Sequence, residues 1–144
     1  LLHNRCLDDH YALFQRYLNS RHGDGQMADM DKNSYAAMIT SSPIDTVLVE
    51  YRDNGELYGV ILVDIQNDGL SLVYSFFDPA KQHLSPGSFM IMDCAAVAHH
   101  MGLPYVYLGY YIAASPKMNY KAKFKSAEIL SNGSWIPLAD IASP

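Results

Sequence analysis

The stretch GLSLVYSFFDPAKQHLSPGSFMIMDCAAVAHHMGLPYVYLGYY, residues 69–111, decides the fold of this chain. Its first part, Leu70–Phe77, is rich in β-branched and aromatic residues and predicts a buried strand that ends at Asp78-Pro79. Pro86 suits the first turn of a helix, which we expect to continue through Phe89–Met101. Because that segment is apolar nearly all round, the helix is predicted to be largely buried.

A second strand is predicted at Tyr105–Tyr111, because Gly102–Pro104 stops the helix and prevents it from resuming. Two strands joined by a helix lie parallel, so residues 69–111 form a crossover unit. In open α/β sheets, ligands bind at the carboxyl ends of the strands, close to the N-terminus of the helix. We therefore expect the chemistry near Ser85, Gly87 and Ser88, small residues that let a ligand approach the first N–H groups.

The segments before this unit predict two helices and an antiparallel meander. The expected elements are a helix from Asp8 or Asp9 to about His22, a helix over Ser34–Ile39, and strands over Thr46–Arg52, Leu57–Ile65 and Leu70–Phe77. Asn-Gly and Asp-Gly turns join the strands, and a last short hairpin is expected around Asn132-Gly133. The predicted fold class is therefore α/β (α+β), with a mixed sheet of antiparallel meander and one parallel crossover.

Composition limits the class of protein. An apolar fraction of 49% and a charged fraction of 17% over 144 residues exclude a disordered chain and suit one domain with a real core. A net charge of −5 argues against generic, charge-driven binding of nucleic acid and leaves room for a local basic patch. No apolar run reaches membrane-spanning length, and two cysteines, Cys6 and Cys94, form no disulfide framework. We expect a cytoplasmic protein with reduced thiols.

The ends of the chain suggest how it is organised. It begins Leu1-Leu2-His3 without Met, and its first helix has a large apolar face, so we expect a fragment of a longer protein. Residues 1–138 are predicted to form one domain, and residues 139–144 a short disordered tail. Cys6 with the nearby His3 falls short of a closed ligand set, so no metal site is predicted here.

The order of elements resembles the GNAT acyltransferase fold. In that fold, the loop and helix N-terminus after the fourth strand hold the pyrophosphate of acyl-coenzyme A. The corresponding loop here, Gln82–Ser88, half resembles that family's Gln/Arg-rich and Gly-rich signature, and Pro86 removes one amide donor from it. We therefore expect no cofactor in this chain, although a coenzyme A–dependent N-acetyltransferase stays open as an alternative.

Five segments, in order, resemble a more specific family, the aminoacyl-tRNA–protein transferases. They are RHGDGQM (Arg21–Met27), VEYRDNGELYGV (Val49–Val60), GLSLVYSFFDP (Gly69–Pro79), GLPYVYLGYY (Gly102–Tyr111) and KMNYKAKF (Lys117–Phe124). The similarity extends from about Tyr11 to Trp135. It departs from the family at Leu84–Ser88, where Arg-Ser-Leu-Gly-Thr is usual, and at Tyr111, where Trp is usual.

The resemblance implies an enzyme that moves leucine, or alternatively arginine, from tRNA to the α-amine of proteins that begin with Asp or Glu, which marks them for degradation. The bacterial spelling of the motifs favours leucine. The resemblance also implies that this chain is the GNAT-like C-terminal catalytic domain. The family's N-terminal domain, with its cysteine cluster for a metal or iron–sulfur centre, lies outside it. The implied partners are aminoacyl-tRNA, proteins with acidic N-termini and that N-terminal domain, with no membrane.

Transfer from an activated ester to an amine depends mainly on placing the two groups together, with a general base adding roughly 10²–10⁴-fold. The candidate catalytic residues are Asp78, Tyr74 and Tyr107; the candidates for binding the protein substrate are Arg21, His22, Lys117, Lys121 and Tyr110; and those for the tRNA acceptor end are Ser85, Gly87, Ser88, Tyr120 and Lys123. Each also has an ordinary interpretation, such as turn forming for Asp78, helix capping for the serines and core packing for the tyrosines. A module that binds acidic N-termini without transferring anything is the remaining alternative.

Overall fold

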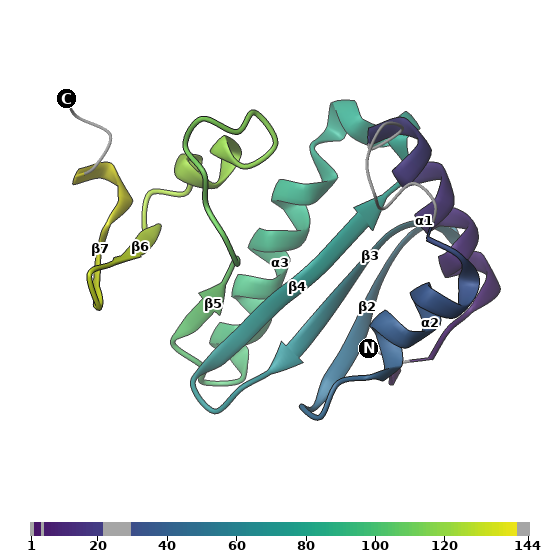
Figure 1. The fold of residues 1–144 in the computed structure, drawn as a ribbon, viewed down its shortest axis with the longest axis horizontal. Helices are drawn as coiled ribbons and strands as arrows, with labels where there is room; N and C mark the ends of the chain where they lie inside the picture. Colours follow the sequence, from purple (N-terminus) through teal and green to yellow (C-terminus); the bar gives the residue numbers. More distant parts are fainter. Residues whose placement is uncertain (1, 4, 22–29, 141–144) are drawn as a thin grey trace. The chain divides into compact units, whose positions relative to one another are not determined.

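The computed structural model describes residues 2–3, 5–21 and 30–140, and the chain divides into two compact units, residues 1–107 and 108–144 (Figure 1). The predicted single domain over residues 1–138 stays a prediction. The predicted tail also stays one, because residues 141–144 lie outside the described residues. No helix in the described part of the chain is long and apolar enough to span a membrane.

The first unit is a five-stranded mixed sheet with helices on both faces. Its elements are β1 (Leu2–His3), α1 (Asp8–Arg21), α2 (Lys32–Thr40), β2 (Thr46–Asp53), β3 (Glu56–Ile65), β4 (Gly69–Phe77), the 3-10 helix η1 (Pro79–Leu84), α3 (Pro86–His100) and β5 (Tyr105–Tyr107). The strand order is β1-β2-β3-β4-β5, and only the β4–β5 pair is parallel. The predicted fold class, the meander and the crossover are confirmed.

The second unit is small. It contains the 3-10 helix η2 (Asn119–Lys123), the hairpin of β6 (Glu128–Ser131) and β7 (Ser134–Pro137), and the 3-10 helix η3 (Leu138–Asp140). The turn of the hairpin is Asn132-Gly133, and both residues adopt positive φ, 50° and 82°. Asn and Gly tolerate this conformation, which explains why the sequence predicted the hairpin at this place.

Helices α1 and α2 pack on one face of the sheet and α3 packs on the other. On the first face, the ring of Phe14 lies 4.8 Å from Tyr35 and 5.4 Å from Phe76, centroid to centroid. On the second face, Gly59 lets the sulfur of Met90 approach so closely that a Cβ on this glycine would lie 3.3 Å from it. Since neighbouring residues of a strand point to opposite faces, the unit has three layers and two apolar interfaces.

Helix α3 is less buried than its composition predicted. The sheet covers Met90, Cys94 and Ala98, whereas Phe89 and Met92 are 52% and 64% exposed. The expectation of a largely buried helix was therefore wrong for half of its surface. A helix in an outer layer presents only one side to the sheet, and apolar composition alone does not show which layer it occupies.

Strand β5 is shorter than predicted, because it ends at Tyr107 rather than at Tyr111. Two residues later Gly109 has φ +75°, which is incompatible with a continuing strand. Within the second unit, the ammonium group of Lys121 donates to the carbonyl oxygens of Leu108 and Tyr110, at 2.6 and 2.7 Å. These bonds hold the backbone on both sides of Gly109.

An ion-pair network joins the first turn of α1 to β2. The imidazole Nε2 of His10, which is fully buried, lies 2.5 Å from Oε1 of Glu50. Arg52 donates to both carboxylate oxygens of Glu50, at 2.9 and 3.1 Å, and to Asp9 at 3.0 Å. The hydrogen bonds from Arg52, followed by that of His10, lower the pKa of Glu50 to about 2. The network holds α1 against the sheet.

We expect Gly69→Ala to lower the free energy of unfolding by roughly 1–3 kcal/mol. A Cβ at Gly69 would lie 2.6 Å from the carbonyl oxygen of Tyr105 and 2.9 Å from the ring of Tyr107, so β4 and β5 would have to separate. The matched control is Gly87→Ala, whose nearest neighbour, the ring of Phe77, would be 3.7 Å away. Urea unfolding of both variants checks this, and equal midpoints for Gly69→Ala and the parent would contradict it.

Glu50→Gln should destabilise the fold at pH 7 by roughly 1–2 kcal/mol, a value reduced for the partial exposure of Arg52. The stabilisation belongs to the ionised carboxylate, so it is fully present above the ordinary pKa of 4.5 and is lost as the pH falls towards about 2. The stability difference between parent and variant should therefore shrink across that window. The exposed Glu56→Gln serves as control, and a constant difference from pH 7 to pH 2 would refute the assignment.

Candidate functional site

The C-terminal half of β4 is an open sheet edge. Strand β5 pairs with β4 only at Gly69, Leu70 and Ser71, opposite Tyr105–Tyr107. Figure 1 shows β5 beside the start of β4, which continues towards its end next to β3. Among the described residues, no strand pairs with this edge over residues 72–77. Edges of this kind bind extended peptides as an added strand in other proteins.

A β-bulge lies where this open edge begins. Leu62 pairs with Tyr74 and Val63 pairs with Leu72, so Val73 is the extra residue on β4. Its side chain is 48% exposed. A bulge bends the strand and interrupts the ladder, and bulges are frequent next to binding sites because they redirect neighbouring groups. This feature could not be predicted from the sequence, since one extra residue leaves the apolar pattern of the strand intact.

Helix α3 begins at the end of β4 without a side-chain cap. Ser85, its N-cap residue, has the left-handed φ of 54°, makes no side-chain capping bond and donates its own N–H to Gln82. Pro86 has no N–H group, so the first amide donors of the helix belong to Gly87 and Ser88. Gly87 also lies against the ring of Phe77, which places these donors beside the last residue of β4.

Asp78 follows β4 directly and is the N-cap residue of the 3-10 helix η1. Its Oδ1 accepts a hydrogen bond from the N–H of Ala80 at 3.0 Å, which is the turn-forming role that the Asp-Pro pair suggests. Its Oδ2 lies 3.8 Å from the guanidinium of Arg16, and the side chain is 22% exposed. One oxygen is therefore used for capping, while the other faces a partly solvated cation. The catalytic role of Asp78 stays a prediction.

Arg21 ends α1 at the same end of the sheet. Its guanidinium donates to the hydroxyl of Tyr17 at 3.2 Å and lies 5.7 Å from the ring centroids of both Tyr17 and Phe77. Arg21 and Gly87 thus both lie near the ring of Phe77. The structure therefore brings Arg21, Asp78 and the start of α3 together. His22, the neighbouring candidate, lies outside the described residues.

The two catalytic tyrosine candidates lie in different surroundings. Tyr74 packs against Phe14 on the face of α1, its hydroxyl is buried without a hydrogen-bond partner, and this burial raises its pKa. Tyr107 instead donates to Asp68, the residue before β4, at 2.9 Å. It pairs with Ser71, seven residues before Asp78, which is roughly 20 Å along the strand. The structure does not bring Tyr107 and Asp78 together.

The remaining candidates belong to the second unit, which is described by itself. Tyr110 is 88% exposed, Lys117 and Lys123 are exposed, and Tyr120 is half-buried. Lys121 uses two of its three N–H donors on the carbonyl groups of its own unit, and burial lowers its pKa. It therefore has a structural role, and one donor remains for a ligand.

One cluster of metal-ligand types occurs in the described part of the chain. Asp9, His10 and Glu50 offer ligand atoms within 4.8 Å of one another. Arg52 already binds both carboxylates, so a cation would have to displace a guanidinium that neutralises the same charges. The residues fit an ion-pair network better than a metal centre, and the prediction that the chain binds no metal stays a prediction.

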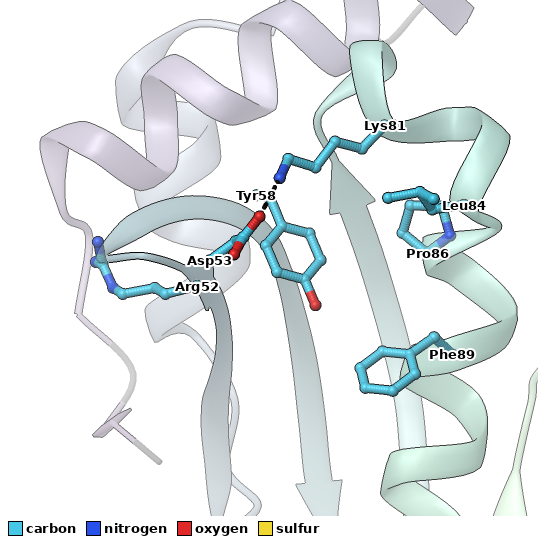
Figure 2. Close-up of a pocket in the computed structure, with 7 residues that line it drawn as sticks. All are labelled: Arg52, Asp53, Tyr58, Lys81, Leu84, Pro86 and Phe89. Carbon is cyan, nitrogen blue, oxygen red and sulfur yellow. Dashed lines mark hydrogen bonds and ion pairs between the residues drawn. The ribbon is translucent and has the colours of Figure 1, made fainter.

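A pocket of about 310 Å³ lies on the other side of the first turn of α3, between α3, η1 and the β2–β3 hairpin (Figure 2). It is lined by Arg52, Asp53, Tyr58, Lys81, Leu84, Pro86 and Phe89. The sequence predicted turn, strand, loop and helix positions for these residues and no pocket. The pocket lies at a second bulge, in which Tyr58 is the extra residue of β3 between the pairs Tyr51–Gly59 and Arg52–Leu57. The sequence pattern does not show this bulge.

Comparison with known proteins identifies similar chains. Residues 9–131 match the family described as arginine-tRNA-protein transferase, C terminus. A protein of Ruegeria pomeroyi, named aspartate/glutamate leucyltransferase, is 52% identical over 92% of this chain and 50% of its own length. Proteins of the same name from Dinoroseobacter shibae and Jannaschia sp. (strain CCS1) are 48% and 51% identical, over 92% and 94% of this chain and 50% and 48% of theirs. The chain thus spans about half the length of these relatives.

Among solved structures, the PaiA N-acetyltransferase of Thermoplasma acidophilum in complex with coenzyme A superposes with a TM-score of 0.64. The superposition covers 91% of this chain and 92% of that one, at 14% sequence identity. Identity this low shows the shared fold alone. The predicted GNAT-like architecture is confirmed by it, and the ligand of that protein carries no weight for this chain.

Proposed function

The chain belongs to the family of the arginine-tRNA-protein transferase C terminus, and on this premise we propose that it is the catalytic part of an aminoacyltransferase. The proposed reaction moves leucine from leucyl-tRNA to the α-amine of proteins that begin with Asp or Glu. The observation that carries the proposal is the identity of about half of all residues, over more than nine-tenths of the chain, with proteins named aspartate/glutamate leucyltransferase. That similarity also favours leucine over arginine.

The geometry supports a reaction site at the C-terminal end of β4. There the uncapped donors of Gly87 and Ser88, the carboxylate of Asp78 and the guanidinium of Arg21 lie around Phe77. Helix N-termini stabilise negative charge, which both the phosphates of the acceptor end and the oxyanion of an attacked ester carry. Extended peptide has an open strand edge to pair with at residues 72–77.

The proposed chemistry is an ester-to-amide exchange. The α-amine attacks the ester carbonyl, the new C–N bond forms, the C–O bond to the ribose breaks, and the amine's proton passes to the ribose oxygen. The ester is already activated and the reference pKa of an α-amine is about 7.7–8.0, so the reaction requires no cofactor. Asp78, with its second oxygen near solvent, would hold or deprotonate the amine. We place the reaction in the cytoplasm, where charged tRNA and new N-termini meet.

Arg21 is our candidate for recognising the acidic side chain of the first residue. A guanidinium matches a carboxylate through two parallel hydrogen bonds, and here its plane is supported by two aromatic rings. It contacts the same Phe77 as the start of α3, so it is suited to hold the side chain while the amine reaches the ester. Lys117 and Lys121 remain the candidates from the second unit.

We expect transfer of radiolabelled leucine from leucyl-tRNA to peptides that begin with Asp or Glu, and little to peptides that begin with Asn. A charge-assisted hydrogen bond contributes roughly 1.5–3 kcal/mol, so Arg21→Gln should reduce the Asp-over-Asn preference about tenfold to a hundredfold. The Ruegeria pomeroyi relative serves as positive control for the assay.

The donor series decides between the alternatives. Transfer from arginyl-tRNA instead would keep the family assignment and change the donor substrate. Use of acetyl-coenzyme A alone would replace the proposed function by N-acetylation. Binding of Asp-initiated peptides without any single-turnover transfer would indicate a recognition module. An unchanged Asp-over-Asn ratio in Arg21→Gln would place the acidic pocket elsewhere.

Asp78 is tested by separating its two roles. Asp78→Asn keeps an oxygen for the N–H of Ala80 and loses the charge, so the single-turnover rate should fall by about 10²-fold or more with stability unchanged. Asp78→Ala also loses the cap and should in addition cost about 1 kcal/mol of stability. A parental transfer rate in Asp78→Asn at every pH from 6 to 9 would leave only the turn-forming role.

A further inference from the structure

The exposed side of α3 differs in composition from the exposed sides of the other two α-helices. The exposed residues of α1 are Asp8, Asp9, Ala12, Gln15, Arg16, Asn19 and Ser20, and those of α2 are Lys32, Asn33, Ser34, Ala37 and Thr40. The exposed residues of α3 are Phe89, Met92, Ala95, Ala96, His99 and His100. A helix in an outer layer usually presents polar and charged residues to solvent, as α1 and α2 do. Helix α3 has the composition of a helix that is covered on both sides.

The apolar strip of this surface consists of Leu84, from η1, and Phe89, Met92, Ala95 and Ala96, from α3. Phe89, Met92 and Ala96 follow one another at i, i+3 and i+7, so they form one line along the helix. Leu84 and Met92 are each 64% exposed and Phe89 is 52% exposed. No member of the strip carries a charge.

The pocket described above lies at one end of the apolar strip. Leu84 and Phe89 line it together with Tyr58 (Figure 2). The buried ring of Tyr51 lies 5.9 Å from that of Phe89, centroid to centroid, and so supports it. At the polar end of the pocket, Lys81 pairs with Asp53 at 2.8 Å. An apolar pocket beside polar groups is the setting in which the anchoring side chains of a protein partner are usually found.

The chemistry of the strip selects among partners. A nucleic acid does not fit it, because binding phosphates requires Lys or Arg and the strip contains neither. Transient protein partners usually meet a more polar surface, whereas permanently covered interfaces resemble a domain core. A partner that belongs to the same polypeptide is always present, so it keeps an apolar surface of this kind away from solvent.

The relatives contain a segment that could be this partner. The chain matches about 50% of the length of the leucyltransferases, so they contain about as many residues again. Because the matching family is described as a C terminus, that other half precedes the matched part.

We propose that the apolar strip and the pocket at its end bind the half that precedes this region in the relatives, with an apolar side chain of that half in the pocket. This goes beyond the proposed function and depends on family membership rather than on the reaction. Helix α3 would then be a middle layer between the sheet and the bound half. Because Gly87 and Ser88 belong to the first turn of the same helix, the bound half would also hold the proposed reaction site in place.

Methionine oxidation measures whether the strip is covered. The half of the Ruegeria pomeroyi relative that this chain does not match is joined to the start of this chain, and the joined protein and the chain alone are treated with hydrogen peroxide. Because the oxidation of a methionine follows its exposure, Met92 should react about tenfold or more slowly in the joined protein. Met38, half-buried on α2 across the sheet, should react equally in both, and buried Met90 should be protected in both. Equal Met92 rates would overturn the proposal.

Cutting the joined protein tests whether the two halves bind each other. A protease site between them is cleaved after folding, and size-exclusion chromatography shows whether they co-elute. We expect the parent halves to co-elute, and Met92→Glu, which places a carboxylate in the covered strip, to weaken their association about a hundredfold or more. Leu84→Gln tests the pocket and should weaken it roughly tenfold to a hundredfold.

The matched control is Ala37→Glu, which adds the same charge at an exposed position of α2 and should leave co-elution unchanged. Parent halves that separate, or parental association in Met92→Glu, would refute the proposal for this chain. The Ruegeria pomeroyi relative, cut in the same way, is the positive control, and separation of its own halves would count against the proposal as well.

Other occupants of the strip give different results. A dimer of the chain alone in sedimentation, with Met92 protected, would assign the strip to a second copy. Protection of Met92 in the monomeric chain would mean that the chain covers its own strip, and both results overturn the proposal. Leucine transfer is measured separately. Transfer by a joined protein with exposed Met92 would leave the proposed function standing and the strip wrong, whereas protected Met92 without transfer would support the strip and count against the function.

Discussion

The three-residue pairing between β4 and β5 is the constraint on which the rest of the molecule depends. Gly69 makes it possible, because any side chain there would meet the carbonyl oxygen of Tyr105 at 2.6 Å. After Ser71 the two strands part, and the extra residue at Val73 bends β4 at that point. The rest of β4 keeps its β3 partner and gains an open edge, and α3 returns to begin beside it. The candidate reaction site lies at the end of β4 because β5 leaves β4 after Ser71.

Much of the fold could be predicted from the sequence because its signals are local. Apolar periodicity placed the helices and strands, the Asn-Gly turns placed the hairpins, and the strand–helix–strand order of residues 69–111 required a parallel pair. The errors arose where local signals are silent. Composition could not show that Phe89 and Met92 are half or more exposed, and the aromatic residues after Tyr107 gave no sign of the left-handed Gly109.

The candidate site was predictable in part for the same reason. Asp78, Gly87 and Ser88 lie at a strand end and a helix start, positions that the order of elements defines. The pocket was missed because it depends on a bulge at Tyr58, and a bulge changes pairing without changing the residue pattern. Lys121 was predicted to bind substrate, but its ammonium group donates two hydrogen bonds to backbone carbonyl oxygens. Which partner such a side chain binds depends on tertiary contacts, which the sequence does not show.

The open edge of β4 also has a consequence for how the protein avoids self-association. A strand edge with free N–H and C=O groups is a template on which a second chain could add, the first step towards domain swapping or fibre growth. The bulge at Val73 interrupts the regular spacing that an incoming strand would need, at the place where β5 stops protecting the edge. The same irregularity that creates room for a short extended ligand thus discriminates against a long one.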